Sequence, residues 1–275
     1  MSKFRTLEIS DSRFECNNLR FMTVKSANLR GRGDICIFVP PGISENQTLP
    51  VVLLLHGVYG SAWAWTHNAG VHLQAMRLIE NGAIPPMIIA MPSDGLWGDG
   101  SGYLAHNGLD FERWIVDDVV QALVEKIRGV TTDSPLFIAG LSMGGFGALR
   151  IGARYGKRFR GISGHSSITN LRQMVLFVEE DVGRYRQQDL ADEDVFETIK
   201  KYRKDLPPLR MDCGSDDQLI EHNRLLHEKM RDAGIEHIYH EYPGGHEWPY
   251  WEKHIVESLQ FFADQLPVVN QNRVH

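Results

Sequence analysis

The pentapeptide Gly-Leu-Ser-Met-Gly at residues 140–144 constrains the fold of this chain more than any other stretch. It follows a short apolar run at 134–139, which indicates a buried strand, and it precedes a Gly-rich segment at 145–150, which is typical of a helix start. A G-x-S-x-G motif between a strand and a helix predicts a sharp turn that lifts the serine hydroxyl out of the sheet. Glycine flanks such a turn because a larger side chain would collide with the neighbouring strand or helix.

Apolar runs alternate with helical segments along the whole chain. The candidate strands lie at 34–39, 51–56, 87–91, 136–139, 161–164, 209–213 and 237–242. The candidate helices lie at 67–81, 111–127, 145–155, 219–233 and 250–265. This alternation predicts an α/β fold with a mainly parallel sheet that carries helices on both faces. The residues up to about 25 indicate antiparallel edge strands, and we expect a single domain over residues 1–275.

Composition narrows the classes of partner. The net charge of −6 gives no electrostatic reason to expect a nucleic acid or an anionic membrane surface. The three cysteines are widely spaced and form neither a metal-ligand pattern nor a disulfide framework, which favours a reducing compartment. We see neither a secretory signal nor an apolar stretch long enough to span a bilayer. We therefore expect a cytoplasmic protein with no nucleic-acid or membrane partner.

One segment breaks the alternation of strands and helices. Residues 170–206 are highly charged, have helical character and lie between two predicted strands. Such a segment is either a surface insertion solvated by its charges or a cap that covers a pocket and shapes the choice of substrate. We expect a helical, cap-like insertion within the single domain.

Ser142 needs partners, because a serine hydroxyl is a poor nucleophile unless a base removes its proton. In this type of turn the partners follow the serine in the order acid, then histidine. His246 fits the base, since it lies in a Gly-rich loop between the last predicted strand and the last predicted helix. Asp217 fits the acid, in the turn after the strand at 209–213. Asp216 is the alternative acid, and either aspartate could instead cap the following helix.

Two backbone amides are expected to bind the charge that develops on an attacked carbonyl oxygen. One is the N–H of Met143, directly after the serine. The other is expected after the apolar run at 51–55, where His-Gly begins a tight turn. We assign this second donor to Val58, with Gly57 and Tyr59 as neighbouring alternatives.

Aromatic side chains surround the predicted site. They either form core beneath long loops or line an apolar substrate pocket. His165, after the strand at 161–164, is a further candidate for the pocket, with a packed loop histidine as the alternative. The candidate substrate-binding residues are Tyr59, Trp63, Trp97, His165 and Trp248.

In combination these pieces resemble the putative esterase family of α/β-hydrolases, which includes esterase D-type S-formylglutathione hydrolases, tributyrin-type and feruloyl esterases, and mycolyltransferases. The resemblance is carried by 34–41, by 53–60 with Trp65 behind it, and by 140–147, 213–217 and 244–246. It implies an α/β-hydrolase fold. It also implies Ser142 as nucleophile, Asp217 as acid and His246 as base, in agreement with the assignment from the residues themselves. Because the family varies most where this chain has residues 170–206, substrates do not carry over.

We expect a serine carboxylesterase that acts on small to medium acyl esters, aryl esters included, through an acyl-enzyme intermediate. Neither a metal nor an organic cofactor is required. The motif does not select water over other acceptors, so a thioesterase of the S-formylglutathione hydrolase type and an acyltransferase are the alternatives. A non-catalytic binding protein is disfavoured, because all the expected side chains are present. The resemblance is compatible with a homodimer, although no sequence feature fixes an interface.

Overall fold

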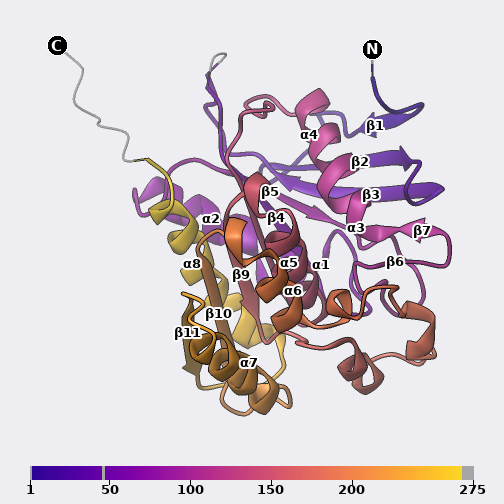
Figure 1. The fold of residues 1–275 in the computed structure, drawn as a ribbon. Helices are drawn as coiled ribbons and strands as arrows, with labels where there is room; N and C mark the ends of the chain where they lie inside the picture. Colours follow the sequence, from indigo (N-terminus) through magenta and orange to yellow (C-terminus); the bar gives the residue numbers. More distant parts are fainter. Residues whose placement is uncertain (1, 45–46, 268–275) are drawn as a thin grey trace.

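The computed structural model describes residues 2–44 and 47–267. The fold is built around one twisted sheet (Figure 1). Its strands are β1 (Leu7–Ile9), β2 (Leu19–Ser26), β3 (Gly31–Phe38), β4 (Val51–Leu55), β5 (Ile88–Pro92), β8 (Leu136–Leu141), β9 (Phe159–His165), β10 (Leu209–Gly214) and β11 (Ile238–Tyr242). They are arranged in the order β1-β2-β3-β5-β4-β8-β9-β10-β11. The pairings from β1 to β5 are antiparallel and those from β5 to β11 are parallel, which confirms the expected sheet. A separate hairpin pairs β6 (Ala105–His106) with β7 (Leu109–Asp110).

Helices cover both faces of the sheet, as the alternation predicts (Figure 1). One face carries α1 (Ala64–Ala69), α2 (Val71–Glu80) and α8 (Trp248–Asp264). The other face carries α3 (Phe111–Arg113), the π-helical turn η1 (Trp114–Val119), α4 (Val120–Lys126), α5 (Met143–Arg154) and α7 (Ile220–Asp232).

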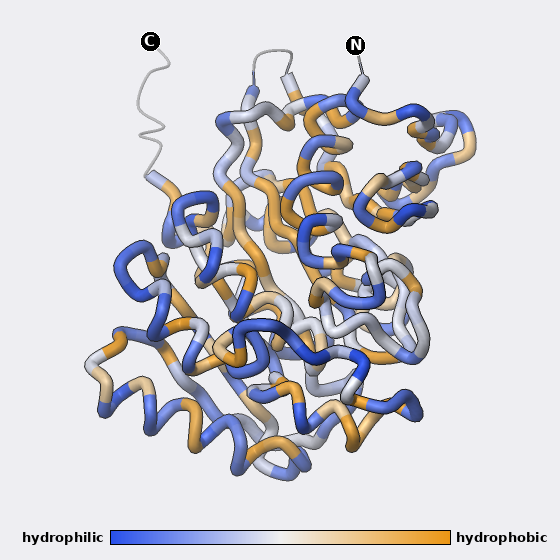
Figure 2. The backbone as a smooth tube through the Cα atoms, turned by 45° about the vertical axis from the view of Figure 1, so that its right-hand side comes forward, coloured by the Kyte–Doolittle hydropathy of each residue, from blue (hydrophilic) through white to orange (hydrophobic). Residues whose placement is uncertain are grey.

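The hydrophobic core therefore lies in two layers, one on each side of the sheet. Every residue of β4 is buried, and successive side chains alternate between the layers: Leu53 packs in one and Leu54 in the other. A strand reads as a continuous apolar run when both of its faces are covered. Figure 2 shows the central strands as continuous hydrophobic stretches, with hydrophilic residues on the surrounding helices and loops.

The helix predicted over 67–81 is two helices, and this boundary was wrong. Gly70 separates α1 from α2 and has a φ of 55°, in the left-handed region. Glycine adopts that conformation without the steric cost of a Cβ, so it ends one helix and redirects the chain into the next.

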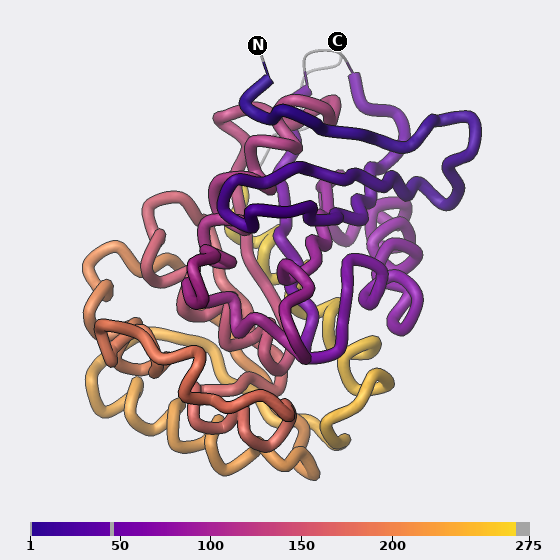
Figure 3. Tube along the Cα trace, turned by 90° about the vertical axis from the view of Figure 1, so that its right-hand side faces the viewer, coloured from indigo at the N-terminus to yellow at the C-terminus, as the bar shows by residue number. Residues whose placement is uncertain are grey.

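The insertion at 170–206 contains less regular helix than the sequence suggested. It consists of the 3₁₀ turns η3 (Leu171–Leu176), η4 (Val182–Tyr185), η5 (Leu190–Glu193) and η6 (Arg203–Asp205), with one α-helix, α6 (Val195–Tyr202). The side chains of Asn170, Asp181 and Asp189 each accept a hydrogen bond from the backbone N–H two residues ahead. Such local side-chain bonds begin a new turn before the preceding one can lengthen into a helix. Figure 3 shows the insertion as the salmon-to-orange trace along the lower part of the molecule.

The core is expected to be sensitive to truncation of Phe262 on α8. This ring is fully buried and stacks on Phe137 of β8, with the ring centroids 4.8 Å apart. We predict that Phe262→Ala lowers the free energy of unfolding by about 3–5 kcal/mol, through lost burial and a residual cavity. Urea unfolding monitored by circular dichroism measures the change. Phe14→Ala, at a position that is 81% exposed, is the control and should change stability by less than about 0.5 kcal/mol.

Candidate active site

Ser142 occupies the sharp turn that the sequence predicts between β8 and α5. Its φ of 54° and ψ of −119° lie outside the regions that residues with side chains ordinarily adopt. A Cβ on Gly140 would lie 2.2 Å from the carbonyl oxygen of Gly144. A Cβ on Gly144 would lie 2.5 Å from the carbonyl oxygens of Leu55 and His56 on the neighbouring strand end. Both glycines are therefore required by the close approach of the helix to the sheet.

Three side chains predicted to act together do lie in one hydrogen-bonded chain. The Nε2 atom of His246 is 3.0 Å from the Oγ of Ser142. The Nδ1 atom of His246 is 2.9 Å and 3.1 Å from the two carboxylate oxygens of Asp217. With Nδ1–H donating to Asp217, Nε2 is left as the acceptor that faces the serine hydroxyl. The residues follow β8, β10 and β11, and the carboxyl ends of these parallel strands meet at one edge of the sheet.

The structure distinguishes between the two candidate acids. Asp216 is exposed, whereas Asp217 is buried and faces His246. Asp217 also accepts a hydrogen bond of 2.8 Å from the backbone N–H of Leu219, just before α7. Leu219 is the residue at the start of α7 and α7 has no side-chain cap, so the alternative of a helix-capping aspartate is not realised; Asp217 bonds the turn before the helix as well as the histidine. The hydrogen bond from the N–H of Leu219 holds the Asp217 carboxylate in position against the imidazole of His246.

The residues predicted to supply the two amide donors lie close together beside Ser142. Met143 is the first residue of α5, so its N–H is one of the helix-terminal donors without a partner inside the helix. Val58 and Met143 are neighbours, because a Cβ on Gly100 would lie 3.4 Å from Val58 Cγ1 and 2.5 Å from Met143 Sδ. Tyr59 is a poorer alternative, since its N–H donates to the carbonyl of Asp99 at 2.8 Å.

His56 braces the turn that carries Val58. Its Nδ1 lies 2.7 Å from the carbonyl oxygen of Gly57, and its Nε2 accepts a hydrogen bond of 3.0 Å from the N–H of Asp94. The hydroxyl of Tyr103 donates to the carbonyl of His56 itself. Both ring nitrogens are therefore occupied in holding two loops together.

Aromatic rings surround the imidazole of His246, but sequence reasoning did not select the nearest ones. Phe177, at the end of η3, stacks on His246 with ring centroids 5.1 Å apart. Trp251 of α8 contacts the same imidazole edge to face, with the ring centroids 5.0 Å apart. Trp248 packs against Trp251 and so lies one ring further away. Trp251 lies in the first turn of α8, close to His246 in the sequence, and could have been selected as a candidate on that ground. Phe177 lies in the distant insertion, and no sequence signal pointed to it.

The remaining aromatic candidates lie further from the imidazole. Tyr59 is 66% exposed, and its hydroxyl donates to the carbonyl oxygen of Phe177 at 2.7 Å. Trp63 is half-exposed and meets the ring of His67. Trp97 packs against His106 and Tyr185. A contact with substrate stays a prediction for each of them.

His165 does not face a pocket, which corrects the sequence-based expectation. It is fully buried at the end of β9, with Nδ1 2.9 Å from Asp212 Oδ2 and Nε2 2.7 Å from Ser258 Oγ. Its backbone carbonyl accepts the N–H of Ser142 at 2.9 Å. The residue therefore supports the serine turn from behind, and its alternative reading as a packed histidine describes it better.

A buried polar network extends from His165 under the whole site. Asp212 of β10 also accepts hydrogen bonds from Arg210 and, at 2.8 Å, from the hydroxyl of Tyr250. Burial alone would raise the pKa of Asp212, but His165 and Arg210 outweigh it and lower that pKa to about 2. Tyr250 in turn lies against Gly244 in the loop that carries His246. The network thus joins β9, β10 and α8; the turn of Asp217 follows β10, and the loop of His246 leads into α8.

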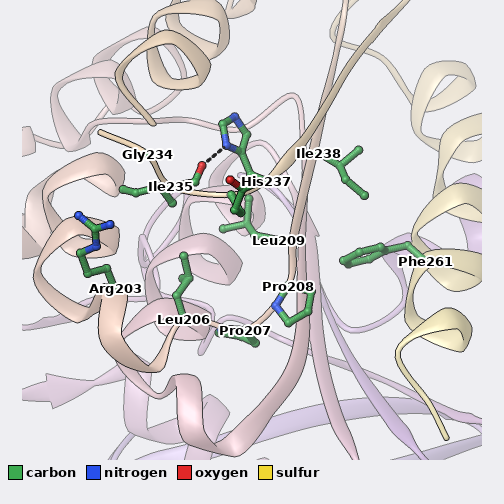
Figure 4. A pocket seen from close by; sticks show the side chains of 11 residues that line it. Arg203, Leu206, Pro207, Pro208, Leu209, Gly234, Ile235, His237, Ile238 and Phe261 are labelled. Atoms are coloured by element: carbon green, nitrogen blue, oxygen red, sulfur yellow. Dashed lines mark hydrogen bonds between the residues drawn. The ribbon is translucent and has the colours of Figure 1, made fainter. Parts of the chain in front are cut away.

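A cavity of about 530 Å³ lies at the opposite edge of the sheet (Figure 4). Leu209 and Ile238 in its wall are the first residues of β10 and β11, whereas Asp217 and His246 follow the ends of these strands. In the view of Figure 4, His237 turns toward the carbonyl of Ile235, to which its Nδ1 is bonded at 2.7 Å. The cavity is therefore separate from the serine site.

Comparison with known proteins identifies the family. A family model described as putative esterase matches residues 26–262. The chain belongs to this family. An acetyl esterase of Caldicellulosiruptor saccharolyticus is 28% identical over 239 residues, which cover 80% of this esterase and 85% of that protein.

Solved structures share the fold of this esterase. A ferulic acid esterase superposes with a TM-score of 0.79 at 23% identity, covering 96% of this chain and 100% of that one. An S-formylglutathione hydrolase of Staphylococcus aureus gives 0.76 at 17% identity, covering 93% and 99%. The expected α/β-hydrolase fold is confirmed, and the family confirms the expected activity as hydrolysis of carboxylic esters. Within the described ranges, no helix has both the length and the apolar character needed to cross a membrane.

The buried network is expected to make stability depend on pH. We predict that Asp212→Asn lowers the free energy of unfolding at pH 7 by about 3–5 kcal/mol, because Arg210 and His165 lose their buried partner. The folded-state pKa of Asp212 is depressed to about 2, so its contribution is present above its ordinary pKa near 4 and is lost as the pH falls toward 2. The difference between wild type and variant should therefore shrink by about 1 kcal/mol between pH 5 and pH 3.

Urea unfolding at these pH values measures the difference for Asp212→Asn. Asp232→Asn, at an exposed position on α7, is the control and should show no such pH dependence. An equal deficit for Asp212→Asn at pH 5 and pH 3 would contradict the assigned role of the carboxylate.

Proposed function

We propose that Ser142, His246 and Asp217 form the catalytic triad of this esterase. The observation that carries the proposal is the unbroken hydrogen-bond chain from Asp217 through His246 to Ser142, at a serine whose backbone φ is 54°. Nucleophile, base and orienting acid stand in the order and geometry that acyl transfer requires. The serine is buried beneath the site loops, with its Oγ directed at the imidazole.

In the first half of the reaction, Ser142 Oγ attacks the ester carbonyl carbon while His246 Nε2 takes the hydroxyl proton. The carbonyl oxygen gains the displaced electron pair, and we assign the N–H groups of Met143 and Val58 as the donors that stabilise it. Asp217 stabilises the imidazolium and keeps its ring in place. As the tetrahedral intermediate collapses, the bond to the alcohol oxygen breaks, and His246 returns the proton to the departing alcohol.

In the second half, a water molecule replaces the alcohol. His246 removes a proton from this water as its oxygen attacks the acyl carbon of the ester now formed with Ser142. The same two amides hold the oxyanion. Cleavage of the bond to Ser142 Oγ releases the carboxylic acid, and the proton on His246 returns to the serine.

We propose small to medium acyl esters as the substrates. The rings of Phe177 and Trp251 both pack on His246, which supplies apolar groups beside the base that an acyl chain could contact. The relative from Caldicellulosiruptor is named an acetyl esterase, which supports a short acyl group. The structural likeness to an S-formylglutathione hydrolase, at 17% identity, concerns the fold and does not favour the thioesterase alternative.

We further propose that the protein acts in the cytoplasm. Its cysteines, Cys16, Cys36 and Cys213, are all free thiols, and the last two are buried. Free cysteines without a disulfide framework are typical of proteins in a reducing compartment.

The triad assignment predicts that Ser142→Ala lowers kcat for 4-nitrophenyl acetate and butyrate by at least about 10⁴-fold. Asp217→Asn should lower kcat by a similar order, since the carboxylate no longer holds the imidazole in its working tautomer. Steady-state kinetics on the purified variants measure both effects, and circular dichroism checks that they fold. Near wild-type turnover by a folded Ser142→Ala protein would refute the assignment.

A further inference from the structure

A short segment of the insertion lies directly over the proposed catalytic base. We call residues 177–181 the acidic strap; their sequence is Phe-Val-Glu-Glu-Asp. The first ring of the strap, Phe177, stacks on His246 at 5.1 Å with an angle of 29° between the ring planes. Any ester whose carbonyl reaches Ser142 therefore passes beside the strap.

The strap is fastened to the two loops around the oxyanion turn. The hydroxyl of Tyr59 donates to the carbonyl of Phe177 at 2.7 Å. The N–H of Glu179 donates to Asp99 Oδ2 at 2.7 Å, and the N–H of Asp99 donates to Glu180 Oε1 at 2.9 Å. Two of these hydrogen bonds fix the backbone of the strap, and the bonds to Asp99 Oδ2 and Glu180 Oε1 hold those two carboxylates in place.

These contacts also place negative charge next to the proposed oxyanion donors. Asp99 precedes Gly100, the residue that lies against both Met143 and Val58. The carbonyl of Asp99 also accepts the N–H of Tyr59, the residue after Val58. The carboxylates of Asp99 and the strap therefore lie on the wall of the site that Gly100 and Tyr59 form beside Met143 and Val58.

The charges that act on Tyr59 at this wall are all negative. Loss of solvent around the phenol of Tyr59, together with Asp99, Glu179 and Glu180, raises the pKa of this tyrosine. Of the basic residues on the same insertion, Arg184 places its guanidinium over the ring of Trp97, 6.0 Å from the centroid.

We propose that the acidic strap makes this esterase select against anionic substrates. Building on the proposed function, esters and thioesters that carry a carboxylate in the acyl or leaving group are poor substrates, and their neutral or cationic counterparts are favoured. Like charges at the rim of a partly desolvated site repel, so an anionic substrate binds more weakly and approaches more slowly. Glutathione thioesters, which carry two carboxylates, fall in the disfavoured class.

Matched substrates test the charge preference directly. On the acyl side, mono-4-nitrophenyl adipate is compared with its methyl ester, which has the same chain without the charge. On the leaving-group side, S-acetylglutathione is compared with its diethyl ester. We expect kcat/KM to favour the neutral member of at least one pair by about tenfold in 20 mM buffer. The ratio should fall in 0.5 M NaCl, because salt screens repulsion between exposed charges.

Glu179→Lys identifies the strap as the source of the preference. The carboxylate of Glu179 is exposed and accepts no hydrogen bond from the described residues, so its reversal leaves the fastening of the strap intact. The variant should raise kcat/KM for the anionic substrate roughly three- to tenfold and leave the neutral substrate unchanged. Glu8→Lys, an equal charge reversal on the distant edge strand β1, is the control and should change neither.

The outcomes separate this proposal from the one on which it rests. Cleavage of the neutral esters that is abolished by Ser142→Ala supports the triad, whatever the charge preference. Equal kcat/KM for both members of each pair in wild type, or a Glu179→Lys protein with unchanged selectivity, would overturn the role of the strap while leaving the triad standing. Failure to cleave any neutral ester would overturn both.

Discussion

The left-handed backbone at Ser142 is the constraint on which the rest of the site depends. A residue with a side chain is held at a φ of 54° only where its surroundings fix it. Here the N–H of Ser142 donates to His165 at 2.9 Å, and its carbonyl accepts the N–H groups of Phe146 and Ile168 at 3.0 Å and 3.2 Å. The neighbouring glycines let α5 approach β4 closely enough for these bonds to form. The turn is thus stabilised from both the sheet and the helix.

Behind this turn, the buried network around Asp212 fixes the relative positions of the loops. Asp212 precedes Asp217 by a few residues on the same strand-and-turn unit, and Tyr250 follows His246 at the start of α8. A polar cluster that is buried and well bonded is rigid, because any displacement leaves a polar group without a partner. The distances between Asp217, His246 and Ser142 therefore depend on buried residues that lie outside this hydrogen-bonded chain. In front of the turn, the acidic strap supplies the charge that a substrate meets.

Much of the fold was predictable because its signals are local. The apolar runs at 51–56 and 136–139 indicated buried strands, and the structure places β4 (Val51–Leu55) and β8 (Leu136–Leu141) there. The break at Gly70 was also readable, since a glycine inside a helical pattern is a common helix end. The insertion was harder: its asparagine and aspartate residues favour short capped turns, but composition alone suggested longer helices. A high content of charged residues indicates that a segment is exposed to solvent, but it does not determine how long its helices are.

The sequence by itself determined the strand–turn–helix around Ser142 and the order in which an acid and a histidine follow it. Those features depend on neighbours in the chain and on the rule that parallel strands end at one edge of a sheet. Only the tertiary structure decided that Asp217 and not Asp216 faces His246, since the two differ in burial and hardly in sequence context. It also decided that Phe177 covers the base and that His165 bonds to Ser258, 93 positions away. Contacts between residues so far apart in the chain follow from how whole elements pack, and no local pattern encodes them.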